Sequence, residues 1–215
     1  MRIIIPAREG SKGLPFKNRK LFKYTAESIP YHLIQDVWVT TDDLEIKQEA
    51  QRQGFNVIDR PDHLSTDTAN IRDVMVHTVD QIHPKLKEPI VMLYLTYPKR
   101  TWETVHLALK EFYKYSEMEI SNSLLCRKEI ATSPYLYLKE TGEGGLFGKQ
   151  LTEHDLYRRQ DYPTCFEICH EVAIFNRVGL IRLNKNMYCD STIFFRIPGA
   201  LDIDTPEDFK KLDAN

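Results

Sequence analysis

Residues 2–20 read RIIIPAREGSKGLPFKNRK, a short apolar run followed by a loop rich in glycine, proline and positive charge. The run of residues 2–6 has the length and the branched side chains of a buried β-strand. Gly10 and Gly13 permit close backbone approach, whereas Pro6 and Pro15 restrict the loop. Because ligands of parallel sheets bind at the carboxyl ends of the strands, this loop lies where a ligand would be held.

Positive charge is concentrated around this loop. From Arg8 to Lys23 the chain has six basic residues and one acid, Glu9, although the formal net charge of all 215 residues is only -2. A local basic excess indicates a small anion such as a phosphate group, and it argues against nucleic acid polymers, whose binding needs a basic face across the domain. The glycine spacing matches neither G-x-x-x-x-G-K-[ST] nor G-x-G-x-x-G.

Apolar runs of strand length alternate with segments of helical periodicity, which is typical of an α/β domain with a mainly parallel sheet. With 42% hydrophobic residues, the chain can bury the core of a single domain, residues 1–215. A short helix interrupted at Pro30 is expected after the first strand. The other expected strands are residues 36–41, 55–58, 89–95, 118–125, 171–176 and 192–198, and the other expected helices are residues 44–54, 68–82, 101–115, a segment near Leu180 and one starting at Pro206.

The alternation fails in residues 133–166, which are rich in tyrosine and glycine. We predict a hairpin that protrudes from the core. Apolar side chains exposed on it would suit a contact between subunits; they include Tyr135, Tyr137, Leu146 and Phe147. A plain surface loop is the alternative.

No segment approaches the roughly 18 apolar residues that span a bilayer, and residues 3–5 are too short an apolar run for a secretion signal. We therefore expect a cytoplasmic protein without membrane association and with reduced cysteines. Cys165, Cys169 and His170 are close enough in sequence to share a metal. Ordinary buried thiols are the alternative, because no second Cys/His cluster follows at zinc spacing.

Asp202 and Asp204 flank one apolar residue, Ile203, near the end of the chain. In extended backbone, residues i and i+2 point to the same side, so the two carboxylates can share Mg²⁺, which prefers oxygen ligands. A basic loop and a carboxylate pair together meet the needs of a nucleoside triphosphate.

Several motifs resemble those of the acylneuraminate cytidylyltransferases, the CMP-sialic acid synthetase family. IIIPAREGSKGLPFKN is similar to the family's I-P-A-R-x-G-S-K-G-[LI]-P-x-K-N, and four later segments match in the same order: VWVTTDDLEI, RPDHLSTDTA, YRRQDYP and LDIDTPEDF. These matches extend from residue 3 to residue 209. Synthetases for the eight-carbon sugar Kdo resemble the chain less, because they carry Arg in place of Gly13.

The resemblance implies that CTP and a carboxylated, nonulosonic sugar react to give the CMP-sugar and pyrophosphate, with Mg²⁺ held by Asp202 and Asp204. Arg8 and Lys17 would contact the phosphates. The implied nucleotide-binding residues are Ala7, Arg8, Gly10, Ser11, Lys12 and Asn18. The implied fold is a three-layer α/β/α sandwich, and the implied assembly is a homodimer that exchanges its protruding hairpins.

The segment that would face the sugar departs from the family. Where relatives have L-Q-P-T-S-P-L-R, this chain has LYLTYPKR, residues 93–100. We expect Tyr94, Thr96 and Arg100 to contact the sugar, together with Gln160 of YRRQDYP. Glu171 and Val172 also stand where relatives often carry Asn-Gly.

Two alternatives to a synthetase remain. Metal-dependent glycosyltransferases share the implied fold and use a D-x-D motif, although theirs normally follows a strand in the middle of the chain. A degenerate nucleotide-binding protein, suggested by LYLTYPKR, would retain the loop without sugar turnover. Arg8, Lys17, Asp202 and Asp204 are all present, which favours the synthetase.

Overall fold

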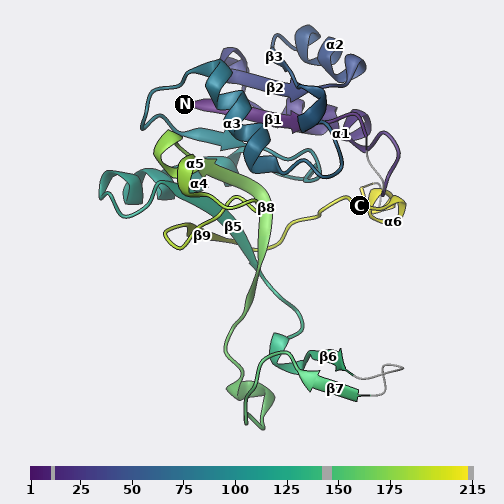
Figure 1. The fold of residues 1–215 in the computed structure, drawn as a ribbon, viewed down its shortest axis with the longest axis vertical. Helices are drawn as coiled ribbons and strands as arrows, with labels where there is room; N and C mark the ends of the chain where they lie inside the picture. The colour runs from purple at the N-terminus through teal and green to yellow at the C-terminus, as the bar shows by residue number, and fades with distance from the viewer. Residues whose placement is uncertain (11–12, 142–146, 213–215) are drawn as a thin grey trace.

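A computed structural model describes residues 1–10, 13–141 and 147–212 of the protein (Figure 1). The strands are β1 (Arg2–Ala7), β2 (Val37–Thr41), β3 (Asn56–Asp59), β4 (Ile90–Met92), β5 (Ser123–Glu129), β6 (Leu138–Thr141), β7 (Phe147–Gln150), β8 (Phe166–Phe175) and β9 (Ile193–Ile197). The α-helices are α1 (Lys17–Ser28), α2 (Leu44–Arg52), α3 (Ile71–Ile82), α4 (Trp102–Glu117), α5 (Arg177–Arg182) and α6 (Pro206–Lys210). Short 3-10 turns lie at Tyr31–Asp36, Asp62–Leu64, Pro134–Leu136 and Arg159–Asp161.

The central sheet has seven strands in the order β3-β2-β1-β4-β8-β5-β9. Neighbouring strands are parallel except at β8, which is antiparallel to both β4 and β5. The predicted α/β class with a mainly parallel sheet is therefore confirmed.

Helices cover both faces of the sheet because the strand side chains alternate between two apolar clusters. Ile3 and Ile5 join a cluster that includes side chains of α1, α2 and α4, whereas Ile4 joins a second cluster with side chains of α3 and α5. All three isoleucines are fully buried. This arrangement is the expected three-layer α/β/α sandwich.

Three strands differ from the sequence-based expectation. The chain pairs in the sheet only at Ile90–Met92 of the expected strand 89–95, although Leu93 and Leu95 remain buried. The expected strand 118–125 was placed too early, because α4 continues to Glu117 and Glu119 turns the chain with a positive φ of 59°. β8 begins at Phe166, five positions before the expected start at residue 171.

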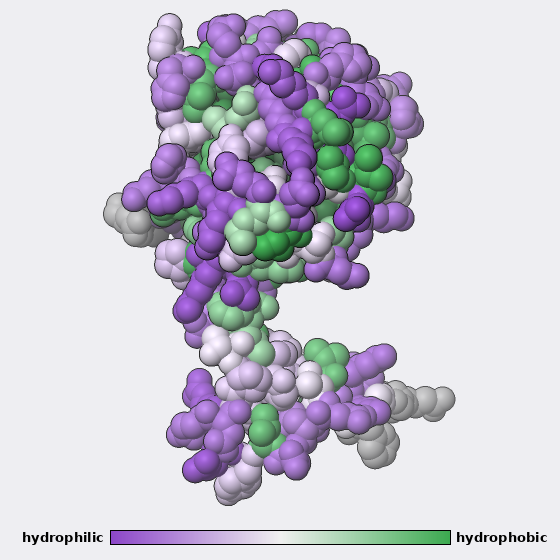
Figure 2. Space-filling view, turned by 90° about the vertical axis from the view of Figure 1, so that its left-hand side faces the viewer, coloured by the Kyte–Doolittle hydropathy of each residue, from purple (hydrophilic) through white to green (hydrophobic). Residues whose placement is uncertain are grey.

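Between β5 and β8 the chain leaves the central sheet and forms a separate two-stranded sheet, β6-β7. We call residues 133–166 the excursion. Figure 1 shows β6 and β7 well away from the central sheet, and Figure 2 shows the excursion as a small lobe joined to the rest by a narrow neck. Leu146, one of the expected contact residues, lies outside the described residues. None of the helices described here is long and apolar enough to cross a membrane.

Candidate active site

The basic loop leaves the sheet at the carboxyl end of β1. Ala7 pairs in register with Thr41 of β2, so Arg8 and Asp42 leave the sheet side by side. The Asn18 side chain, at the start of α1, donates to the Arg8 carbonyl at 2.8 Å. This bond ties the two ends of the loop together. Ala7 itself is fully buried, so only its backbone can face a nucleotide.

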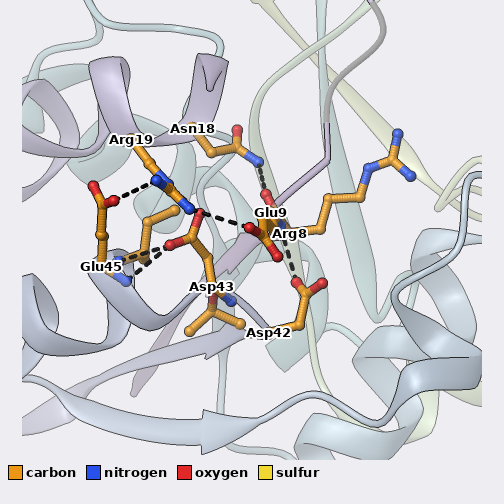
Figure 3. Close-up of polar contacts among 9 residues, drawn as sticks. Arg8, Glu9, Asn18, Arg19, Asp42, Asp43 and Glu45 are labelled. Atoms are coloured by element: carbon orange, nitrogen blue, oxygen red, sulfur yellow. Dashed lines mark hydrogen bonds and ion pairs between the residues drawn. The ribbon is translucent and has the colours of Figure 1, made fainter. Parts of the chain in front are cut away.

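A group of acidic residues forms hydrogen bonds and ion pairs that support the basic loop (Figure 3). Asp43 is buried and caps α2 by accepting from the backbone N–H groups of Glu45 and Ile46, and it also accepts from Arg19 Nε at 2.7 Å. The Arg19 guanidinium further pairs with Glu9 and Glu45. This network, together with a bond from the Glu9 N–H to Asp42 at 3.0 Å, fixes the loop against α1 and α2.

The side chain of Arg8 is directed away from this network (Figure 3) and lines a cleft of about 290 Å³. Gly10, Lys17 and Asn18 line the same cleft, so the described residues of the predicted phosphate site are brought together. Ser11 and Lys12, also predicted to bind the nucleotide, lie outside the described residues. Arg8 pairs with Asp67 at 2.7 Å across the cleft.

The acid pair at the end of the chain lies next to this cleft. Asp202 and Asp204 line a second hollow of about 280 Å³, together with Lys17, Tyr94, Thr96, Tyr97 and His170. Three of these residues, Lys17, Tyr94 and Thr96, also line the first cleft. The two hollows therefore adjoin, and the acid pair lies beside the basic loop.

The acid segment is fixed by its backbone and by its side chains. Ile203 is fully buried, and its N–H donates to the Thr96 carbonyl at 2.8 Å. Asp204 pairs with Lys17 Nζ at 2.6 Å. The two aspartates thus reach the same hollow from either side of a buried anchor, as the D-x-D spacing predicts.

Gly13 brings the loop and the acid segment into backbone contact. A Cβ atom at this position would lie 2.4 Å from the carbonyl oxygen of Asp204, which is closer than real Cβ atoms come. Glycine is therefore required here for the close approach and not only for loop freedom.

One observation in the structure supports a divalent cation at these carboxylates. Asp202 Oδ1 is buried and has no hydrogen-bond partner among the described residues. A buried carboxylate oxygen without a partner is costly unless a cation or a donor satisfies it. The described residues contain no group of three His, Cys, Asp or Glu side chains that could hold a metal, so phosphate oxygens or waters would have to complete the ligand set.

The predicted sugar-binding residues separate into two groups. Tyr94 and Thr96 line both hollows. Arg100 does not line either: it is 5% exposed, and its guanidinium donates to the carbonyls of Tyr94 and Glu171 and to the Thr25 hydroxyl. Its position in this structure is a buried brace between α1, β8 and the segment after β4. Gln160 lies in the 3-10 turn Arg159–Asp161 of the excursion and lines neither hollow.

Several lining residues had no predicted role. Arg60 and Asp67 belong to the RPDHLSTDTA motif, and both line the same cleft as Arg8. Arg60 is 8% exposed and donates to the Thr40 carbonyl. Burial lowers the pKa of Arg60 to about 10, which still leaves the guanidinium charged at neutral pH. The motif itself was the available signal for both residues.

Tyr97 and His170 also line the hollow that contains Asp202 and Asp204, although the sequence predicted no role for them there. The His170 ring packs edge-on against Tyr94 with centroids 5.5 Å apart, and burial lowers the pKa of its imidazole. Burial, together with the Asp202 carboxylate, raises the pKa of Tyr97. The hydroxyl of Tyr97 therefore keeps its proton at neutral pH. Only the departure of LYLTYPKR from the family pattern pointed to Tyr97.

The alternative metal site at Cys165, Cys169 and His170 is not formed by the described residues. Cys169 is buried opposite Cys126 in the β5-β8 pairing, whereas Cys165 donates to the Pro163 carbonyl. Both remain free thiols.

Comparison with known proteins agrees with this fold. Residues 2–95 match the family described as "Cytidylyltransferase". An N-acylneuraminate cytidylyltransferase of Streptococcus agalactiae is 26% identical over 96% of this chain and 51% of its own length. A CMP-N,N'-diacetyllegionaminic acid synthase of Legionella pneumophila is 27% identical over 97% of this chain and 94% of its own length. The chain thus spans about half the length of the streptococcal relative.

Solved structures show the same fold at low identity. A CMP:2-keto-3-deoxy-manno-octonic acid synthetase in complex with CTP superposes with a TM-score of 0.69 at 16% identity, covering 99% of this chain and 96% of that one. A 4-diphosphocytidyl-2C-methyl-D-erythritol synthase of Anaerococcus prevotii gives 0.61 at 11% identity, covering 99% and 97%.

The chain is thus similar to cytidylyltransferases in sequence over residues 2–95, and it shares its fold with solved structures of that class. Within that class, its resemblance to the N-acylneuraminate enzymes is confirmed by relatives that align with nearly all of it.

Proposed function

We propose that this protein activates a nonulosonic acid with CTP, giving the CMP-sugar and pyrophosphate. The observation that carries the proposal is the pair of adjoining hollows at the carboxyl ends of β1 and β4. One contains Arg8, Lys17 and Asn18, and the other contains Asp202 and Asp204. Lys17 lines both, so the triphosphate would lie between the loop and the acid pair.

The chemistry requires control of charge on the phosphates. An anomeric hydroxyl oxygen of the sugar forms a bond to the α-phosphorus of CTP, its proton passes to water, and the bond to the bridging oxygen breaks. Pyrophosphate leaves with that electron pair. Arg8 and Lys17 would stabilise the negative charge that moves onto the leaving group.

Asp202 and Asp204 would hold Mg²⁺, which when bound neutralises phosphate charge and orients the triphosphate. In the described structure Lys17 neutralises Asp204, and Arg8 pairs with Asp67. Arg8 and Lys17 therefore each already have a carboxylate partner, and phosphate oxygens would replace these partners when the nucleotide binds.

The acceptor class rests on sequence similarity more than on geometry. An N-acylneuraminate enzyme and a diacetyllegionaminic acid enzyme are both similar to the chain. Each of these names refers to the acid form of a sugar, which is why we propose an acceptor of the nonulosonic acid class. The hollow beside the acid pair, walled by Tyr94, Tyr97 and His170, is where we place this sugar.

The test is pyrophosphate release from CTP and Mg²⁺ with a panel of sialic, legionaminic and pseudaminic acids. We expect release with at least one sugar and a CMP-sugar product of matching mass. Absence of release with every sugar would overturn the proposal. Transfer or hydrolysis of a ready-made nucleotide-sugar would instead favour a glycosyltransferase.

Comparing Lys17→Met with a control lysine substitution distinguishes the loss of a phosphate contact from the general loss of one positive charge. Lys17 is the cation common to both hollows, so we expect kcat/KM for CTP to fall by about 100-fold or more. Lys23→Met is the matched control, because Lys23 lies on the same helix with an exposed side chain near Tyr24. Equal effects of the two substitutions would contradict the placement of the triphosphate.

A further inference from the structure

Tyr97 connects three segments that meet at the acid pair. It lies in the segment after β4 and is 5% exposed. Its hydroxyl donates to Asp202 Oδ2 at 2.8 Å and accepts from the backbone N–H of His170, in β8, at 3.2 Å. The hydroxyl is therefore itself held in place by the central sheet.

This bond makes the two oxygens of Asp202 unequal. Oδ2 is occupied by Tyr97, whereas Oδ1 is buried and has no hydrogen-bond partner among the described residues. The backbone beside this carboxylate is also held, because the N–H of the next residue, Ile203, donates to the Thr96 carbonyl. One carboxylate oxygen is thus left without a hydrogen-bond partner on a residue that lines the same hollow as Asp204 and Lys17.

Asp204 is held quite differently. Its side chain is 64% exposed and bonds the flexible ammonium group of Lys17. Of the two carboxylates, only that of Asp202 is held by a rigid, buried donor. Carboxylates that bind metals are commonly held in this way by hydrogen bonds from a second layer of residues.

We propose that Tyr97 is a positioning residue that fixes the carboxylate of Asp202, so that its free oxygen Oδ1 is presented to a divalent cation. This inference rests on the metal site of the proposed function. Tyr97 occupies the position at which the family pattern has serine, a side chain shorter by an aromatic ring. The tyrosine is thus a feature of this chain and not of the family pattern.

The experiment is a titration with Mn²⁺ in the absence of nucleotide, followed by the electron paramagnetic resonance signal of the free ion. Tyr97→Phe keeps the ring and removes only the donor. We expect its Mn²⁺ affinity to fall by about 10-fold to 100-fold relative to wild type. Tyr94→Phe is the matched control, since the Tyr94 hydroxyl makes no hydrogen bond to Asp202 in the described structure, and its Mn²⁺ affinity should stay within about twofold.

A double-mutant cycle with Asp202→Asn shows through which group Tyr97 acts. If Tyr97 works through Asp202, Tyr97→Phe should have little further effect on Mn²⁺ affinity in the Asp202→Asn background. An equal loss of Mn²⁺ affinity in both backgrounds would show that Tyr97 does not act through Asp202, and it would overturn the inference. Thermal unfolding of each variant identifies any loss that comes from misfolding.

The outcomes separate this inference from the proposed function. Unchanged Mn²⁺ affinity in Tyr97→Phe overturns the positioning role even if wild type releases pyrophosphate from CTP. Weakened Mn²⁺ binding in Tyr97→Phe but not in Tyr94→Phe supports the role even if no sugar in the panel is a substrate. Failure of wild type to bind Mn²⁺ overturns the positioning role together with the metal site.

Discussion

Gly13 and Asp204 are far apart in sequence, yet their backbones touch at the candidate site. The phosphate loop therefore comes close enough to the acid segment for Lys17 to reach Asp204. At the scale of single residues, the candidate site therefore depends on glycine at position 13 as well as on its charged groups.

Gly13→Ala should displace residues 202–204, because its Cβ would lie 2.4 Å from the Asp204 carbonyl oxygen. We expect pyrophosphate release to fall by about 10-fold or more, since small displacements of catalytic groups are costly. Gly199→Ala is the control, because a Cβ atom there has nothing within 4 Å. If Gly13→Ala retained full activity, the contact between loop and acid segment would not matter for turnover.

Asp204→Asn should lose most activity, by about 100-fold, because it removes a charged ligand from the proposed cation site. Raising the Mg²⁺ concentration should restore part of the rate. The exposed Asp190 provides a matched control in Asp190→Asn. Turnover that was unchanged in Asp204→Asn would show that the metal binds elsewhere.

At the scale of elements, α1 and α2 meet the phosphate loop through Asp43 and Arg19 (Figure 3). The Asp43 side chain has no exposed surface, caps α2 and bonds Arg19. The TDD residues at the end of β2 thus hold the loop in place from behind.

Asp43→Ala should lower the free energy of unfolding by about 2 kcal/mol, because the helix loses its cap and Arg19 loses a buried partner. Urea denaturation measures this change. Asp59→Ala is the control: Asp59 pairs with Lys47 through a side chain that is 78% exposed, so its loss should cost about 0.5 kcal/mol or less. Similar losses in both variants would show that Asp43 is no more than a surface charge.

At the scale of the whole molecule, the excursion exposes apolar side chains that the central core does not cover. Leu136, Leu138, Leu151 and Tyr157 are each more than half exposed. Such side chains on a lobe with a narrow neck (Figure 2) fit the expected contact with a second copy of this chain. In such a contact Gln160, which lines neither hollow of its own chain, would lie close to the second copy.

Leu151→Asp should therefore convert a dimer into monomers, because a buried charge in an apolar contact is strongly unfavourable. Size-exclusion chromatography with light scattering measures the mass. Leu86→Asp is matched in exposure, at 59% for both leucines, but Leu86 lies in the turn before β4. A wild-type monomer, or an equal response of both variants, would contradict a dimer formed through the excursion.

Arg100 shows why a motif alone does not establish a contact with the sugar. It was expected to contact the sugar because it is retained in the altered LYLTYPKR segment. The structure buries it instead, with bonds to Thr25, Tyr94 and Glu171. A retained arginine looks the same in sequence whether it binds a ligand or braces a core, because only its packing distinguishes the two.

The sequence by itself determined the α/β class, the strand that leads into the basic loop, and the spacing that places Asp202 and Asp204 on one side. These follow from local periodicity and from residue chemistry, which need no distant partner. Only the tertiary structure decided that β8 is antiparallel, that Tyr97 bonds Asp202, and that Gly13 meets Asp204. Each depends on segments far apart along the chain, which the folded sheet brings into contact.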